Sequence, residues 1–140
     1  CPTSSIKSKY YYFLSVIFYI LKINKNNFKI VIAGFGSSVL RALNLDDSAN
    51  LLSTNYIGHL GSVNSIVRLN SINLASCSSD FKIRIWNIND ASLICTFNGH
   101  TSNILKLLVL PSQHLASASC DVKTKFFFTT SNFKFNKMKF

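Results

Sequence analysis

The sequence predicts an all-β protein built of antiparallel hairpins. Short runs of aliphatic, aromatic and β-branched residues recur along its 140 residues, and clusters of Asn, Gly, Asp, Ser or Pro separate them. No stretch keeps a helical periodicity of 3.6 residues over about a dozen positions. Several short motifs also recur after 41 residues, which indicates that one structural unit is present more than once.

Ten runs fit the strand pattern. They are Phe18–Ile23, Phe28–Ala33, Val39–Leu45, Val63–Leu69, Leu74–Cys77, Lys82–Ile88, Leu93–Phe97, Ile104–Leu110, Leu115–Ser119 and Lys123–Thr129. The segments Asn24–Asn27, Asn70–Asn73 and Pro111–His114 have the residue types that tight turns need. Strands joined by such turns predict antiparallel pairing between neighbours in the sequence.

The composition excludes a disordered chain, because 48% of the residues are hydrophobic. The formal net charge of +10 lies entirely at the two ends. Residues 30–122 carry five basic and five acidic side chains, whereas residues 1–29 and 123–140 each carry five lysines and no acid. The central part is therefore neutral, and any role for the basic charge belongs to the ends.

The first strand-like run begins within an apolar stretch of 14 residues, 10–23. It is too short to span a membrane, which takes roughly 20 apolar residues, and it is rich in aromatic and β-branched residues. A strand fits it best, with a signal or anchoring segment and translated non-coding sequence as alternatives. The chain starts at Cys1 and not at Met, so we expect it to be a fragment of a longer protein.

The four cysteines predict neither a metal site nor a cofactor site. Cys1, Cys77, Cys95 and Cys120 include no C-x-x-C pair and no metal-ligand spacing. Buried, unpaired thiols are the expected state, with a disulfide or a metal role as the alternative. This fits a reducing, intracellular compartment, either cytoplasm or nucleus.

The repeated motifs identify the unit. They are Gly58–His59 and Gly99–His100, Leu74–Ser76 and Leu115–Ser117, and Asp80 and Asp121. Together with Trp86 in the run Lys82–Asn87, they resemble the WD40 repeat family, whose repeat opens near Gly-His, passes through a Leu-Ala-Ser strand and an Asp turn, and closes on Trp-Asp. Asn87 departs from the closing Asp, and Phe127 stands 41 residues after Trp86.

The resemblance implies a partial WD40-type β-propeller of two to three four-stranded antiparallel blades that does not close on its own, since closed propellers have typically 4–8 blades. We expect the following divisions: 1–17, a basic and apolar N-terminal segment; 18–57, a degenerate blade; 58–98, the best-matching repeat; 99–128, a truncated repeat; and 129–140, a basic tail that is expected to be disordered.

The resemblance also implies a structural hydrogen-bonded network inside each blade. Its members are His59, Ser76 (with Ser78 as the alternative), Asp80 and Trp86 in one repeat, and His100, Ser117 and Asp121 in the next. A serine, a histidine and an aspartate could also form a hydrolytic triad. However, the set recurs with the repeat, as a fold network does and a single active site does not, so we expect no enzyme.

The expected function is a non-catalytic scaffold that presents loops to other proteins and packs against the remaining blades of the same propeller. The candidate partner-binding residues are Leu60, Ser62, Ser79, Phe81, Thr101, Asn103 and Val122. The alternative is a module that binds nucleic acid or an anionic surface through its Lys-rich ends, where aromatic residues such as Phe133 could stack on bases.

Overall fold

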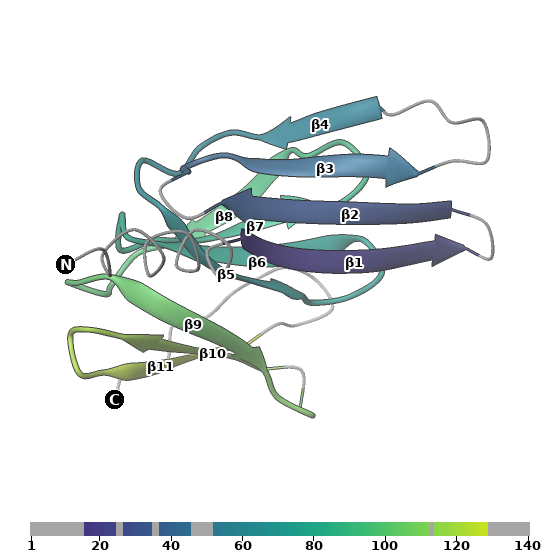
Figure 1. The fold of residues 1–140 in the computed structure, drawn as a ribbon. Helices are drawn as coiled ribbons and strands as arrows, with labels where there is room; N and C mark the ends of the chain where they lie inside the picture. The colour runs from purple at the N-terminus through teal and green to yellow at the C-terminus, as the bar shows by residue number, and fades with distance from the viewer. Residues whose placement is uncertain (1–15, 25–26, 35–36, 46–51, 113, 129–140) are drawn as a thin grey trace, which may run out of the picture.

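The computed structural model describes residues 16–24, 27–34, 37–45, 52–112 and 114–128. Within these ranges the chain forms eleven strands in three antiparallel sheets and no helix, and none of the sheets closes on itself (Figure 1). The all-β class and the open, hairpin-built sheets that the sequence predicts are therefore confirmed.

The strands follow one another in space as they do in sequence. The first sheet contains β1 (Val16–Asn24), β2 (Asn27–Gly34), β3 (Leu40–Leu45) and β4 (Leu52–Tyr56). The second sheet contains β5 (Val63–Arg68), β6 (Asn73–Ser78), β7 (Ile83–Asn87) and β8 (Leu93–Phe97). The third sheet contains β9 (Ile104–Val109), β10 (His114–Ser119) and β11 (Thr124–Phe128). In every sheet each strand pairs with the next one along the chain.

Polar side chains close the turns between these strands. In the β5–β6 turn, Asn70 Oδ1 accepts hydrogen bonds from the backbone nitrogens of Ile72 and Asn73, both at 2.9 Å. In the β7–β8 turn, Asn87 Oδ1 accepts from the nitrogen of Asn89 at 2.8 Å. Asparagine side chains favour such turns because they replace a backbone acceptor locally.

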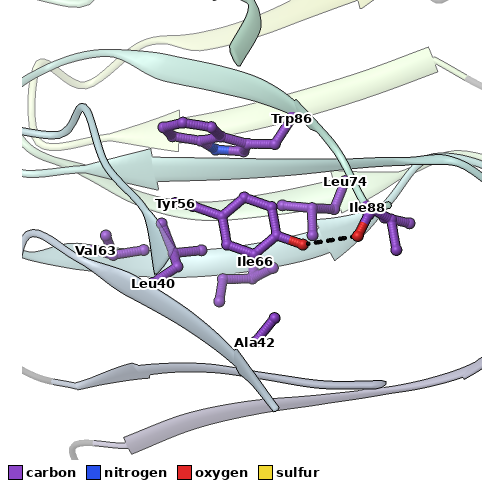
Figure 2. Close-up of a cluster of buried hydrophobic side chains, with 8 residues drawn as sticks. All are labelled: Leu40, Ala42, Tyr56, Val63, Ile66, Leu74, Trp86 and Ile88. Carbon is purple, nitrogen blue, oxygen red and sulfur yellow. Dashed lines mark hydrogen bonds between the residues drawn. The ribbon is translucent and has the colours of Figure 1, made fainter. Parts of the chain in front are cut away.

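The first and second sheets share a buried apolar cluster. Leu40, Ala42 and Tyr56 come from the first sheet, and Val63, Ile66, Leu74, Trp86 and Ile88 come from the second sheet or its β7–β8 turn. Figure 2 shows the Tyr56 ring beside the Trp86 indole, with the Tyr56 hydroxyl donating to the Ile88 carbonyl at 3.3 Å. The two aromatic groups meet edge to face at 5.7 Å, an arrangement that aromatic pairs favour. Burial raises the pKa of Tyr56 to about 12.

A second cluster joins the second and third sheets. Its buried members are Ala75, Cys77, Ile83 and Ile85 from the second sheet, with Ile104, Leu107, Leu115 and Phe127 from the third. Residues alternate between the two faces of a strand, so along β6 the side chains of Leu74 and Ala75 enter different clusters. Every residue of β6 is buried as a result.

The third sheet has one covered face and one open face. Along β9, Ile104 and Leu107 are buried while Leu108 is exposed. The backbone register places Ala116 between Leu108 and Phe126, and Phe126 is also exposed. An apolar row therefore faces solvent on the side of the third sheet that points away from the second.

Each of the ten predicted runs overlaps one strand of the structure, but β4 has no counterpart among them. Its sequence, Leu52–Tyr56, contains Ser, Thr and Asn, which are more typical of turns. It is a strand because it pairs with β3, in a register that sets Tyr56 opposite Leu40. Tertiary pairing decides the structure here against the local preference. Residues 10–15 of the N-terminal apolar stretch lie outside the described residues.

Candidate functional site

Close approach of the β4–β5 loop to the second sheet explains two glycines. A Cβ atom on Gly58 would lie 3.0 Å from Cη2 of Trp86, and a Cβ atom on Gly61 would lie 2.9 Å from the backbone nitrogen of Asp80. Either contact would force the loop away from the sheet. The glycine that precedes His59 thus lets the imidazole reach the strands beneath it.

The structure brings His59, Ser76, Asp80 and Trp86 into one buried hydrogen-bonded chain. Trp86 Nε1 donates to Ser76 Oγ at 2.8 Å. Ser76 Oγ lies 2.7 Å from His59 Nε2, and His59 Nδ1 lies 2.9 Å from Asp80 Oδ2. The chain crosses β7 and β6 and reaches the loop before β5, so one network holds two strands and a loop together.

The donors in this chain fix the proton positions. The indole N–H of Trp86 can only donate and the ionised Asp80 can only accept, so a neutral His59 carries its proton on Nδ1, and its Nε2 accepts from Ser76 Oγ. The Nδ1 proton is donated to Asp80. Burial lowers the pKa of His59, although Asp80 opposes this effect. His59 is therefore a neutral structural imidazole at physiological pH.

Asp80 is the point where the network meets the loops. Its Oδ2 accepts from the backbone nitrogen of Leu60 at 3.0 Å, and its Oδ1 accepts from the backbone nitrogen of Lys82 at 3.0 Å. Desolvation by itself would raise the pKa of Asp80. The hydrogen bonds from Leu60, His59 and Arg84 outweigh it and lower the pKa to about 2.

Arg84 is a member of this site that the sequence did not single out. Its Nη1 donates to Asp80 Oδ2 at 2.6 Å and lies 2.6 Å from His59 Nδ1. The alternation of β7 sets Arg84 on the face opposite Ile83 and Ile85, which is also the face of Trp86. Arg84 is in fact buried, and its charge further disfavours protonation of His59.

The third sheet contains an equivalent hydrogen-bonded network. His100 Nε2 lies 2.7 Å from Ser117 Oγ, and His100 Nδ1 lies 2.8 Å from Asp121 Oδ2. Asp121 accepts from the backbone nitrogens of Thr101 and Lys123, each at 3.0 Å. These hydrogen bonds outweigh desolvation and lower the pKa of Asp121. The histidine, serine and aspartate therefore take the same relative places in both sheets.

The two networks differ at their inner ends. Phe127 stands where Trp86 stands in the second sheet; it is buried and packs 4.7 Å from the ring of Phe97. A phenyl ring fills the space but cannot donate to Ser117. Lys125 takes the place of Arg84, and its Nζ donates to the Gly99 carbonyl instead of to the aspartate.

A serine beside each aspartate supports the turn. Ser78 Oγ donates to the Gly61 carbonyl at 2.8 Å and accepts from the Asp80 nitrogen at 3.1 Å. In the third sheet, Ser119 Oγ donates to the Ser102 carbonyl and accepts from the backbone nitrogen of Asp121. Of the two serines considered for the second-sheet network, Ser76 touches His59, and Ser78 braces the turn.

The candidate partner-binding residues lie at one end of the stacked sheets, where β5 and β7 begin and β6 ends. Asn64 links this end of the second sheet to the third, because its Nδ2 donates to Ser79 Oγ at 3.1 Å and to the Ile104 carbonyl at 2.8 Å. The exposed candidates are Leu60, Phe81, Thr101, Asn103 and Val122, and the half-buried ones are Ser62 and Ser79.

The described residues place no three His, Cys, Asp or Glu side chains where they could hold a metal ion. Cys77 is a buried free thiol, and burial raises its pKa to about 12. Cys95 is half-buried, with its pKa raised to about 11 for the same reason, and Cys120 is exposed. Thiols with raised pKa values are poor nucleophiles and poor metal ligands at neutral pH.

The Lys-rich tail, 129–140, and residues 1–15 of the N-terminal segment lie outside the described residues. The predictions made for these two segments therefore stay predictions. In the described part of the chain no helix is long and apolar enough to cross a membrane.

Comparison with known proteins identifies one segment. Residues 49–87 match the family described as WD domain, G-beta repeat, so this part of the chain is a WD40 repeat. The matched segment runs through β4, β5, β6 and β7, and it therefore starts in the first sheet and ends in the second. No curated protein matches the chain.

The bond between Trp86 and Ser76 predicts energetic coupling between the two side chains. We expect Trp86→Phe to lower the free energy of unfolding by roughly 1–3 kcal/mol, because a buried hydrogen bond and part of a buried side chain are lost. In a double-mutant cycle measured by urea unfolding, Trp86→Phe and Ser76→Ala should couple by about 1 kcal/mol.

Ser117 provides the matched control for this cycle, because it is the equivalent serine of the third sheet, where Phe127 takes the place of the indole. Trp86→Phe combined with Ser117→Ala should show coupling near zero. Equal coupling in both cycles would mean that the indole does not act through Ser76.

The lowered pKa of Asp80 predicts acid sensitivity. An unfolded aspartate has its ordinary pKa near 3.8, above the value of about 2 in the fold, so the unfolded chain takes up protons first as the pH falls. Stability from Asp80 is complete above about pH 4 and declines towards pH 2. Asp80→Asn should reduce the loss in unfolding free energy between these pH values by about 1–2 kcal/mol.

Guanidinium denaturation at each pH measures this effect. Asp90→Asn is the control, since Asp90 is exposed in the β7–β8 turn and lies outside the network. An acid response that is the same in Asp80→Asn and in the unmodified chain would contradict the proposed role of the carboxylate.

Proposed function

We propose that the chain is a non-catalytic scaffold, part of a larger multi-repeat protein, that presents its β4–β5, β6–β7 and equivalent third-sheet loops to other proteins. WD40 repeats are typically protein-interaction scaffolds, and one is present at residues 49–87. An intracellular location, in the cytoplasm or the nucleus, belongs to the same proposal and rests on the cysteine pattern described above.

The observation that carries the proposal is the contrast between a closed polar network and open loops beside it. Ser76 is fully buried, and its hydroxyl is engaged by both Trp86 and His59. A nucleophile in that position has no path to a substrate. Leu60, whose amide donates directly to Asp80 of this network, is 85% exposed.

The network also makes the loops rigid, which favours binding. The Asp80 carboxylate holds the backbone before and after the β6–β7 turn to the β4–β5 loop through the amides of Leu60 and Lys82. A loop that is ordered before a partner arrives loses less conformational entropy on binding. The same bonds from Thr101 and Lys123 to Asp121 order the third-sheet loops.

Further blades of the same propeller are the partners that we propose for the open face of the third sheet. In the second sheet, Val67, Ala75 and Ile85 occupy the equivalent positions and pack against the third sheet. Leu108, Ala116 and Phe126 would be covered in the same way by a following blade, which supports the proposal that the functional protein contains more repeats.

The nucleic-acid alternative rests on the composition of ends that lie mostly outside the described residues, and it stays a prediction. Salt separates the two functions. Phosphate contacts weaken steeply as salt rises, whereas protein partners held by apolar side chains are far less sensitive.

The scaffold proposal predicts that loop substitutions abolish partner capture and leave the fold intact. Leu60→Glu and Phe81→Glu should each remove the same set of cross-linked partners, quantified by mass spectrometry at low and high salt, with an unchanged circular dichroism spectrum. An apolar side chain at an interface centre contributes about 1–3 kcal/mol to binding, enough for a tenfold or larger loss.

Ile72→Glu is the matched control, because Ile72 is an exposed apolar residue in a hairpin turn at the opposite end of the second sheet. It should leave capture unchanged. Partners that are lost equally with Ile72→Glu, or kept with both loop substitutions, would contradict the assignment of these loops.

A further inference from the structure

An apolar residue followed by a lysine recurs in the turns beside both networks. Phe81 and Lys82 follow Asp80 in the β6–β7 turn, and Val122 and Lys123 follow Asp121 in the β10–β11 turn. These four residues, together with Leu60 and Thr101 of the preceding loops, form the loop surface. It presents the same chemistry twice, once from the second sheet and once from the third.

The apolar members of the loop surface have an unfavourable backbone conformation. Phe81 has φ 66° and Val122 has φ 62°, the left-handed region that glycine and asparagine adopt most readily. In each turn this residue donates its amide to the serine three positions earlier, at 3.2 Å. A β-branched residue such as Val122 is the least suited to this position.

Packing within the fold does not compensate for this strain at Val122. Its side chain is 96% exposed, and that of Phe81 is 41% exposed. Strained residues persist where the surrounding structure holds them, and they cluster at functional sites. Exposed apolar side chains held in this way are better explained by contact with a partner than by stability of the chain.

The charge of the loop surface is basic. The two acids of these turns are withdrawn from solvent, with side chains of Asp80 and Asp121 only 6% and 4% exposed, and both serve as acceptors inside the networks. Asp90, the remaining acid of the described residues, lies in the β7–β8 turn at the other end of the second sheet. Lys82 is half-buried and Lys123 is exposed, so the ionisable groups facing a partner here are cations.

The two turns lie along one continuous edge. Asn64 joins Ser79, in the first turn, to the start of β9. The backbone nitrogen of Cys120, in the second turn, donates to the Asn103 carbonyl at 2.9 Å, in the loop before β9. Since both turns are tied to the segment that begins β9, one extended ligand can contact both.

We propose that the loop surface binds an acidic peptide segment that carries apolar side chains, with carboxylates directed to Lys82 and Lys123 and apolar groups placed on Leu60, Phe81 and Val122. The proposal rests on the scaffold function proposed above and specifies its partner. Opposite charge fixes the register and raises the association rate, and the apolar contacts supply most of the affinity.

Synthetic peptides test the partner chemistry directly on the full chain. A fluorescent peptide that alternates Asp or Glu with Leu and Phe should bind in a polarisation assay, and a peptide with Lys in place of the acids should not. Lys82→Glu and Lys123→Glu should each weaken binding of the acidic peptide about tenfold, because each substitution replaces attraction to a carboxylate by repulsion. The double variant should bind the Lys peptide instead.

Lys106→Glu is the matched control for the net positive charge of the chain. Lys106 is exposed on β9 opposite Ala118, outside the loop surface, so this variant changes the charge equally but should alter peptide affinity less than twofold. An equal loss with Lys106→Glu would mean that the peptide responds only to net charge, and the proposal would be overturned.

Val122→Asn separates binding from folding. Asparagine tolerates positive φ, so the melting temperature should rise by a few degrees, while peptide affinity should fall because the apolar contact is lost. A variant that is more stable and weaker in binding cannot be explained by misfolding. Unchanged affinity would remove Val122 from the binding surface.

Cys120 gives an independent readout in the same turn. In a Cys1→Ser background, saturating acidic peptide should slow alkylation of the exposed Cys120 several-fold, with the buried Cys77 as an internal reference.

A single-stranded oligonucleotide that binds through Lys82 and Lys123 more tightly than the peptide does would overturn the proposal. If Leu60→Glu removes cellular partners but the lysine substitutions do not, the acidic-partner inference fails and the scaffold function stands.

Discussion

The hydrogen bonds to the Asp80 carboxylate connect the buried framework to the surface. Through Oδ2, Asp80 joins His59, the Leu60 amide and Arg84; through Oδ1, it holds the amide of Lys82. The loop before β5, the β6–β7 turn and strand β7 therefore have a common anchor. Because the carboxylate is almost fully buried and its pKa is about 2, this anchor stays ionised throughout the physiological pH range.

Sheet stacking provides the environment in which this polar network is stable. The second sheet is covered on one face by Leu40 and Tyr56 of the first sheet and on the other by Leu107 and Leu115 of the third. Burial on both faces removes water from the His–Ser–Trp chain. The hydrogen bonds within the chain therefore replace those that these side chains would otherwise make to water. A neutral His59 is the consequence, held between the Ser76 hydroxyl and the Asp80 carboxylate.

Much of this arrangement could be predicted because it repeats. The spacing of 41 residues grouped His59, Ser76 and Asp80 with His100, Ser117 and Asp121, and the structure brings both groups together. Hydrophobic periodicity located most strands for a similar reason: a strand buried on one or both faces must carry regularly placed apolar residues.

The features that were missed depend on contacts distant in sequence. Strand β4 forms because β3 offers it a partner, and its own Ser, Thr and Asn residues give no strand signal. Arg84 is placed as an ordinary outward residue by alternation, yet the His59 loop folds back over it and converts it into an ion-pair partner of Asp80. The positive φ angles of Phe81 and Val122 could not be predicted either, because neither residue type favours that conformation.

Each aspartate anchors the loop in front of its own sheet. Amide hydrogen exchange can measure this anchoring, because the backbone nitrogens of Leu60 and Thr101 donate to Asp80 and Asp121 respectively. In Asp80→Asn, exchange at Leu60 should accelerate well beyond any change at Thr101, and Asp121→Asn should reverse the pattern. Equal acceleration at both amides in both variants, or no change at either, would contradict the claim that these carboxylates position the loops.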